Sequence, residues 1–356
     1  MVHRPMLSVL ELLDLFAALG AVILTAVSAL LTGLPGRGPD DEPSLYLHVC
    51  YAATRKLLAR CSAEQLQWLL PRASVVYKQQ TKAFGLTPRV INLPHGARGN
   101  WIGDPDAEHV LVWYHGGGFG LPVLNGHIKF LMRFIKSRGS RKPSLSILFL
   151  EYTLAPIAQY PTQLIQAVET LRYLITTMKR SPSNIMIGGD SAGGNLVTAV
   201  LSHLKHRHEA IDKLTLSEPL AAAIMMAPWT GLNRPDVLLE RYSGGDIVSK
   251  ASLHRWAANY TGDATPDYYT DASRAPTEWF RGFPVNKILV LAGQDEYLLP
   301  AIDGFVKTLQ AGYGPFEFYV ADKEVHDAPF VNLFCHDYSP TRQGTKLMDW
   351  IEGVIA

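Results

Sequence analysis

The sequence predicts an α/β protein in which a mostly parallel central sheet is flanked by helices. From about residue 89 onward, short apolar runs alternate with stretches of helical periodicity, the pattern of strands joined by crossover helices. In addition, 47% of the 356 residues are hydrophobic and only 18% are charged, so the chain has enough apolar material for a large core. The length alone permits two domains or one large domain.

The charge balance excludes several classes of protein. The chain has 33 Lys and Arg against 32 Asp and Glu, a formal net charge of +1. Nucleic-acid binding requires an excess of cations, and disorder requires low hydrophobicity with a high net charge, so we expect neither. Cys50, Cys61 and Cys335 are too few and too scattered for a disulfide framework or a zinc site.

The N-terminal segment has the length and composition of a membrane helix. Residues 15–34 carry no charge, and twenty apolar residues suffice to cross a bilayer core. A cleaved signal peptide is one alternative, although Glu11 and Asp14 make the leading region acidic where a signal is basic. A helix packed on the protein itself or on a partner chain is another. We expect membrane attachment, with the endoplasmic reticulum as the site and the cytoplasm as the alternative; the oligomeric state stays open.

The remaining chain divides into regions of different composition. We expect a hydrophobic N-terminal anchor at residues 1–36, a linker followed by cap helices at 37–88, and an α/β domain at 89–356. Within that domain, residues 229–283 interrupt the alternation and are rich in aromatic residues, Pro and Gly. This stretch therefore predicts an insertion that covers the sheet as part of a cap.

Individual elements follow from apolar runs and from helical periodicity. The predicted strands are residues 109–114, 146–152, 184–188, 222–226, 287–292 and 316–321. The predicted helices are residues 162–178, 192–205, 300–311 and 340–355, with a further helical region at 44–77.

A nucleophile motif occupies the junction between a predicted strand and a predicted helix. Residues 189–193, GDSAG, match G-x-S-x-G, with the strand 184–188 before and the helix 192–205 after. Glycines on both sides allow a sharp turn that exposes the serine oxygen at the strand's carboxyl end. Ser191 is therefore the candidate nucleophile; the alternative is a glycine-rich helix start with an N-capping serine.

A second glycine-rich motif, HGGGF at residues 115–119, follows the predicted strand 109–114. Glycine amides can approach the oxyanion of a tetrahedral intermediate closely and donate hydrogen bonds to it. The amide of Ala192, directly after the nucleophile, supplies another donor. The alternative is a glycine-rich turn without function.

A serine nucleophile needs a base, and the base needs an acid that orients it. In this architecture their chain order is Ser, acid, His. His326 follows the strand 316–321 after a short loop and is the expected base, with His336 as the alternative. Asp295 and Glu296 follow the strand 287–292, and either carboxylate is a candidate acid.

These motifs resemble the hormone-sensitive-lipase family of α/β-hydrolases. HGGGF, GDSAGG and residues 151–156, EYTLAP, stand in the family's order, the last resembling its DYRLAP segment. The likeness extends from about residue 110 to the end, and the fungal steryl acetyl hydrolase-like branch is the most similar because of the hydrophobic N-terminus and the HDAP run at residues 326–329. It implies an α/β-hydrolase fold with a helical cap, and no metal or cofactor.

The resemblance also implies roles for particular residues. It assigns the oxyanion amides to Gly117, Gly118 and Ala192. The family's acid begins a D-P-L-x-D run before an apolar helix, and aligning Glu296 there keeps the apolar positions in register, whereas Asp295 shifts them by one. Glu296 is therefore preferred over Asp295, although Glu replaces the usual Asp.

The expected function is hydrolysis of a carboxylic ester through an acyl-serine intermediate. The apolar N-terminus suggests a lipophilic substrate, such as an acetyl or short-acyl ester of a sterol or a fungal metabolite. One alternative is the same site used for acyl transfer or for biosynthetic cyclisation. The other is a non-catalytic module that binds a small molecule, because fold alone does not determine function.

Overall fold

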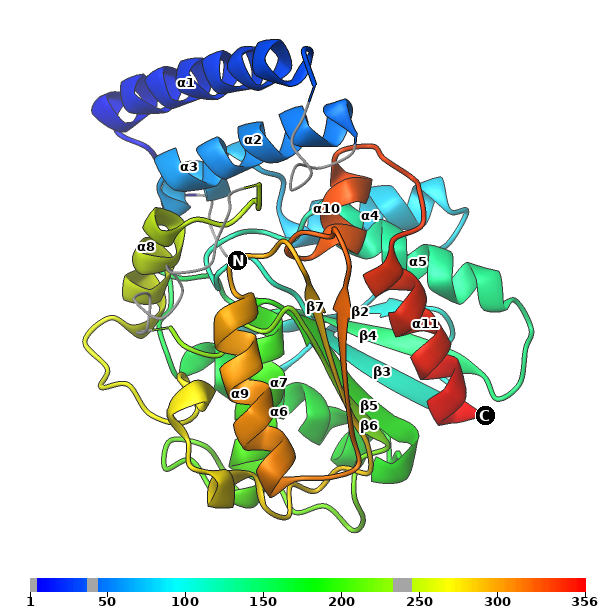
Figure 1. The fold of residues 1–356 in the computed structure, drawn as a ribbon. Helices are drawn as coiled ribbons and strands as arrows, with labels where there is room; N and C mark the ends of the chain where they lie inside the picture. Colours follow the sequence, from blue (N-terminus) through cyan, green and yellow to red (C-terminus); the bar gives the residue numbers. More distant parts are fainter. Residues whose placement is uncertain (1–4, 37–43, 233–244) are drawn as a thin grey trace.

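A single eight-stranded sheet forms the centre of the molecule (Figure 1). The computed structural model describes residues 5–36, 44–232 and 245–356. The strand order is β1-β2-β4-β3-β5-β6-β7-β8; β2 is antiparallel to β1 and β4, and all other pairs are parallel. The strands are β1 (Arg89–Asn92), β2 (Arg98–Ile102), β3 (His109–Tyr114), β4 (Leu145–Glu151), β5 (Ile185–Asp190), β6 (Ala222–Met226), β7 (Ile288–Gly293) and β8 (Phe316–Ala321).

The predicted fold class is confirmed, and the strands that were not predicted lie along one side of the sheet. All six predicted strands are present, and β3, β6 and β8 have the predicted bounds. β1 and β2 were not among them, because β1 is a mostly exposed edge strand and β2 contains Gly99 and Asn100 in place of a continuous apolar run. Parts of the predicted linker and cap insertion, residues 37–43 and 233–244, lie outside the described residues.

Helices cover both faces of the sheet and bury two separate apolar cores. Helices α6, α7 and α9 pack on one face, and α5, α10 and α11 pack on the other. The sequence did not predict α5 or α10. The bounds are α5 (Asn125–Arg138), α6 (Thr162–Arg172), α7 (Ala192–Lys205), α9 (Leu299–Gly312), α10 (Ala328–Phe334) and α11 (Arg342–Ile355).

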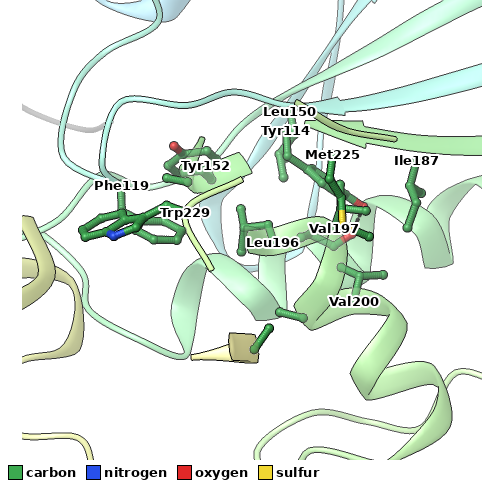
Figure 2. Close-up of a cluster of buried hydrophobic side chains, with 14 of the residues drawn as sticks. Tyr114, Phe119, Leu150, Tyr152, Ile187, Leu196, Val197, Val200, Met225 and Trp229 are labelled. Atoms are coloured by element: carbon green, nitrogen blue, oxygen red, sulfur yellow. Dashed lines mark hydrogen bonds between the residues drawn. The ribbon is translucent and has the colours of Figure 1, made fainter. Parts of the chain in front are cut away.

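The core behind the nucleophile motif is built by α7 and the central strands (Figure 2). Leu196, Val197 and Val200 of α7 lie against Ile187 of β5 and Met225 of β6, and all five are fully buried. Because each of these side chains removes its whole apolar surface from water, this packing fixes α7 firmly against the sheet. The first turn of α7, which follows Ser191 directly, is held by the same core.

A cap lies over the carboxyl ends of the parallel strands. It consists of α2 (Leu45–Arg60), α3 (Ala63–Leu69) and α8 (Lys250–Thr261). Helix α4 (Ala73–Ala83), by contrast, packs beside α5 against the sheet, where the Tyr77 hydroxyl donates to Trp101 O of β2 at 2.5 Å. Arg255 of α8 donates to the carbonyl oxygens of Leu58, Ala59 and Cys61 at 2.7–3.1 Å. These carbonyls belong to the last turn of α2, where no intrahelical donor remains. One arginine thus joins the insertion to the N-terminal part of the cap.

The N-terminal helix α1 (Val9–Gly33) lies alongside α2 on the outside of the cap (Figure 1). The Arg60 guanidinium of α2 pairs with both carboxylate oxygens of Asp14, and the Gln65 amide of α3 donates to Asp14 Oδ2 at 3.0 Å. Leu15 and Ala18 are buried on the inner side of α1. The helix is therefore attached to the folded domain along one side, rather than joined to it only through a linker.

Candidate active site

The parallel strands bring three loops together at the carboxyl end of the sheet. The register aligns Asp190 with Met226, Met226 with Leu291, and Leu291 with Tyr319, so β5, β6, β7 and β8 end close together. The loops after β5, β7 and β8 carry Ser191, Glu296 and His326, respectively. The strand order therefore gathers residues that are up to 135 positions apart in the chain.

Ser191 occupies a strained turn between β5 and α7. Its φ is +51° and its ψ is −115°, a conformation that costs free energy for a residue with a Cβ. Its N–H donates to Met226 O at 2.8 Å, and its carbonyl accepts from the N–H of Trp229 at 3.0 Å. A Cβ at Gly193 would lie 1.8 Å from Tyr114 O, so glycine is required where α7 meets β3. The predicted strand-turn-helix context of the motif is present.

The glycine turn, residues 116–118, lies against the nucleophile. A Cβ at Gly116 would come within 3.0 Å of the Ser191 Cβ. Gly117 and Gly118 have φ values of +103° and +57°, and a Cβ at Gly118 would lie 2.5 Å from the Trp256 ring. Both the backbone conformation and the lack of space therefore require glycine here. The turn therefore lies close to Ser191 and to Ala192, which follows Ser191 in the chain.

Asp190 connects the glycine turn to the nucleophile turn. Its fully buried carboxylate accepts from Gly116 N at 2.8 Å and Trp113 Nε1 at 2.9 Å, and it pairs with His127 Nε2 at 2.9 Å. Burial alone would raise the pKa of Asp190, but pairing with His127 and the hydrogen bonds lower it. Sequence analysis missed this pair because His127 lies in the unpredicted helix α5, although Asp190 stood inside the recognised motif.

His326 faces the carboxylate of Glu296. Its Nδ1 lies 3.6 Å from Glu296 Oε1, and Glu296 Oε2 accepts from Gly293 N at 2.7 Å. Both side chains are buried. Asp295, the alternative acid, is half-buried and uses its N–H to bind Glu324 O at 3.0 Å. The geometry thus favours Glu296 over Asp295 as the orienting group.

The alternative base, His336, lies away from this edge. It is exposed in the loop after α10, and its Nδ1 shares a hydrogen bond with the Tyr338 hydroxyl at 3.4 Å. The structure therefore gathers Ser191, Glu296 and His326 and leaves His336 apart.

A second carboxylate faces the other nitrogen of the base. Asp327 Oδ2 lies 3.3 Å from His326 Nε2, and within the described part of the chain no hydrogen bond joins that nitrogen to the Ser191 hydroxyl. Catalytic hydrogen bonds commonly close only when substrate binds. Burial lowers the pKa of His326, but the charges of Asp327, Glu296 and Asp246 outweigh it and raise the pKa to about 10. Sequence analysis did not single out Asp327 or Asp246.

Aromatic side chains crowd the glycine turn on the side of the cap. The Phe119 ring stacks on Tyr260 of α8 with centroids 3.6 Å apart and lies 6.3 Å from the Trp229 ring. Figure 2 shows Phe119, Tyr152 and Trp229 grouped beside the start of α7. All of them are buried, so the cap side of the glycine turn is apolar.

A separate cavity of about 590 Å³ lies at the end of β4. Its walls include Arg72, Arg98, Glu151, Tyr152 and Ile157, and Ser191 and His326 are not among its lining residues. Among the described residues, no group of three or more His, Cys, Asp or Glu side chains is arranged to hold a metal ion.

Comparison with known proteins agrees with this geometry. Residues 111–330, more than half of the chain, match a family described as having the alpha/beta hydrolase fold. The chain belongs to this family. The resemblance inferred from HGGGF and GDSAGG is thereby confirmed.

Similar proteins of the α/β-hydrolase family carry names of esterases. Steryl acetyl hydrolase 1 of Saccharomyces cerevisiae is 35% identical over 112 residues, which cover 30% of this chain and 25% of the yeast protein. An acetyl esterase of Salmonella schwarzengrund is 26% identical over 183 residues, 46% of this chain and 53% of the enzyme. A solved esterase from Pseudomonas putida superposes with a TM-score of 0.67 at 17% identity, covering 90% of this chain and 97% of that one. The curated relatives are thus matched over at most about half of their length, and the structural likeness shows the fold.

The first prediction separates the two candidate acids of this α/β-hydrolase. We expect Glu296→Gln to lower kcat by about 10³- to 10⁴-fold, because an amide does not stabilise the imidazolium that forms during proton transfer. Asp295→Asn, the matched control, should change kcat less than about threefold. Steady-state kinetics on a chromogenic acetyl ester measures both. A larger loss in the Asp295 variant would assign the acid to Asp295.

The second prediction concerns pH. His326 accepts a proton only in its neutral form, and the nearby carboxylates stabilise its charged form, so kcat/KM should rise with pH towards the raised pKa of His326. Asp327→Asn removes the charge 3.3 Å from Nε2 and should move the acidic limb of the profile down by about one pH unit. Asn tolerates the left-handed backbone at this position, where φ is +53°. An unshifted limb would mean that Asp327 does not control the base.

Proposed function

We propose that this protein is a serine hydrolase that cleaves a carboxylic ester through an acyl-serine intermediate. The observation that carries the proposal is the convergence at one sheet edge of a strained serine, a glycine turn against it, and a buried histidine facing a buried carboxylate. A ligand-binding module needs no base paired with an acid, so this arrangement favours an enzyme.

In the proposed reaction, Ser191 Oγ attacks the ester carbonyl carbon while His326 Nε2 takes its proton. The amides of the glycine turn and of Ala192 bind the oxyanion of the tetrahedral intermediate. His326 then protonates the leaving alcohol, and the ester C–O bond breaks to give the acyl-serine. The same histidine activates a water molecule that releases the acid. Glu296 orients the imidazole and stabilises its charged form throughout.

The proposed substrate is an ester with an acetyl or other short acyl group and a lipophilic alcohol. Buried rings of Phe119, Trp229 and Trp256 surround the glycine turn and leave an apolar, crowded environment at the carbonyl. Such surroundings favour a small acyl group and an apolar alcohol over a charged one. The names of the yeast and Salmonella relatives, a steryl acetyl hydrolase and an acetyl esterase, support the acetyl group.

Acyl transfer or cyclisation uses the same residues up to the acyl-serine and differs only in the group that attacks it. Acyl transfer is favoured over hydrolysis when water is excluded from the acyl-serine, and Ser191 is only 6% exposed. Product analysis with and without a competing alcohol distinguishes the two reactions. Free acid as the sole product supports hydrolysis.

We also propose that α1 attaches the protein to a membrane. The helix has 25 residues, a mean hydropathy of 2.3 over its most apolar window, and only 17% of that window buried. Its outer face carries Phe16, Leu24 and Leu31, each more than 60% exposed. An apolar face of this length fits lipid, because it would be costly in water. The endoplasmic reticulum remains the proposed location and the cytoplasm the alternative.

The third prediction tests the nucleophile. Ser191→Ala should lower kcat for acetyl esters by about 10⁴-fold or more, leaving only the contribution of the oxyanion hole and of binding. A fluorophosphonate probe should label the wild-type protein at Ser191 and should not label the variant, as peptide mass spectrometry can establish. Ser202→Ala, a buried serine of α7, is the control for labelling and should react like the wild type. Full turnover by the Ser191 variant would refute the acyl-serine route.

The fourth prediction tests the outer face of α1. Deleting residues 1–36 does not test membrane contact alone, because the deletion would also remove the packing of Asp14 and Leu15 against the cap. The triple variant Phe16→Gln, Leu24→Gln, Leu31→Gln keeps that packing and should reduce the fraction that pellets with membranes by at least about tenfold.

The triple variant should hydrolyse short water-soluble esters at the wild-type rate. A matched control changes three exposed apolar residues outside α1 to Gln and should still pellet. If the α1 variant pellets like the wild type, this face does not contact lipid. The control positions are Leu86, Val90 and Tyr338.

A further inference from the structure

A buried carboxylate that belongs to the cap insertion lies between the two loops that carry the acid and the base. Asp246 has no exposed surface. Its Oδ1 accepts from His326 N at 3.0 Å, and its Oδ2 accepts from Tyr297 N at 2.8 Å. One oxygen thus binds the residue that is the candidate base, and the other binds the residue next to the candidate acid, Glu296.

These two hydrogen bonds add a side-chain bridge between the loops after β7 and β8, which Asp295 N also joins by donating to Glu324 O at 3.0 Å. Tyr297 N follows the Glu296 carbonyl directly, and His326 N belongs to the base itself, so a single rigid carboxylate bridges both backbones. The side chains they carry are 3.6 Å apart, from His326 Nδ1 to Glu296 Oε1. Displacements of about 1 Å in such an arrangement can lower a rate a hundredfold.

The charge of Asp246 acts on the same histidine. Burial raises the pKa of Asp246 to about 6, while the charge of His326 and the N–H donors oppose the rise. The ionisable groups around it include His326, Glu296 and Asp327 from the two loops and the guanidinium of Arg55 from the cap. Asp246 therefore adds to the negative charge that stabilises the imidazolium of His326.

The main chain of Asp246 is held by the N-terminal part of the cap. Arg55 of α2 donates from its guanidinium to the Asp246 carbonyl at 2.6 Å, and Asp246 Oδ1 also accepts from Ile247 N at 2.7 Å. Asp246 is thus fixed at both ends: α2 binds its main-chain carbonyl, and its own turn and the two loops donate to its carboxylate.

We propose that Asp246 is a positioning residue that holds the Glu296 loop and the His326 loop at a fixed spacing and links both loops to the cap. This role rests on the proposed serine hydrolase function. Asp246 acts through His326 and Glu296 and does not itself touch the ester.

The test compares Asp246→Asn with a matched control. Asp has two acceptor oxygens, whereas Asn has one oxygen and one NH₂ donor. In Asp246→Asn the NH₂ group therefore faces the N–H of either Tyr297 or His326, and one of the two hydrogen bonds is lost. Asp267→Asn is the control: Asp267 lies in the same insertion and accepts from two backbone N–H groups, of Tyr269 and Thr270, at 2.9 Å, but these belong to neither catalytic loop.

We expect Asp246→Asn to lower kcat at least tenfold with KM changed less than about threefold, because the substrate is not contacted. The acidic limb of its pH profile should move to lower pH, since a charge near His326 is lost. Asp267→Asn should leave kcat within about twofold and the limb unshifted. The proposal would be overturned if Asp246→Asn left the pH profile unshifted and changed kcat no more than the control does.

A measurement independent of turnover separates this proposal from the proposed function. In a titration of the His326 imidazole by NMR with labelled histidine, the His326 pKa should be lower in Asp246→Asn than in the wild type. This result is expected even if no ester is hydrolysed, and an unchanged pKa would contradict the proposal. If Asp246→Asn does not fold, Arg55→Met, which releases only the Asp246 carbonyl, should lower kcat several-fold with KM unchanged; an unchanged kcat would overturn the link to the cap.

Discussion

The parallel pairing of β5, β6, β7 and β8 is the constraint on which the site depends. Parallel strands in register end at the same edge, so every loop that leaves this edge is within reach of the others. The serine turn, the acid loop and the base loop leave β5, β7 and β8, respectively. The loops of Ser191 and Glu296 leave strands β5 and β7, every residue of which is buried, so these loops start from fixed points.

Buried carboxylates then fix the loops relative to one another. Asp190 binds the glycine turn to the nucleophile turn, Asp246 binds the acid loop to the base loop, and Glu296 binds the turn at Gly293. Each carboxylate accepts from backbone N–H groups, which cannot rotate away as side chains can. In an interior of low dielectric these charge-assisted hydrogen bonds are strong, and leaving one partner unpaired is costly. The same charges that position the histidine also raise its pKa.

The cap connects this rigid edge to the surface of the molecule. Arg255 joins α8 to the end of α2, Arg55 of α2 reaches Asp246, and Arg60 of α2 pairs with Asp14 of α1. Three arginines therefore link the apolar outer helix, the cap and the catalytic loops in a continuous series.

The sequence by itself determined the fold class and named Ser191, Glu296 and His326 as the candidate site residues. Continuous apolar runs predict buried strands because both faces of a parallel sheet are covered, and the glycines around Ser191 and in HGGGF predict turns that other residues cannot form. The edge strands β1 and β2 and the helices α5 and α10 have weaker local patterns and were missed. Only the tertiary structure placed Asp190 beside His127 and Asp246 beside His326, because these partners are distant in the chain and no local pattern marks a carboxylate as buried. Asp327 adjoins His326 in the chain, but only the fold brings its carboxylate to the Nε2 side of the ring. The tertiary structure was also needed to place α1 along the cap, because an apolar helix that crosses a bilayer and one that packs along one side have the same composition.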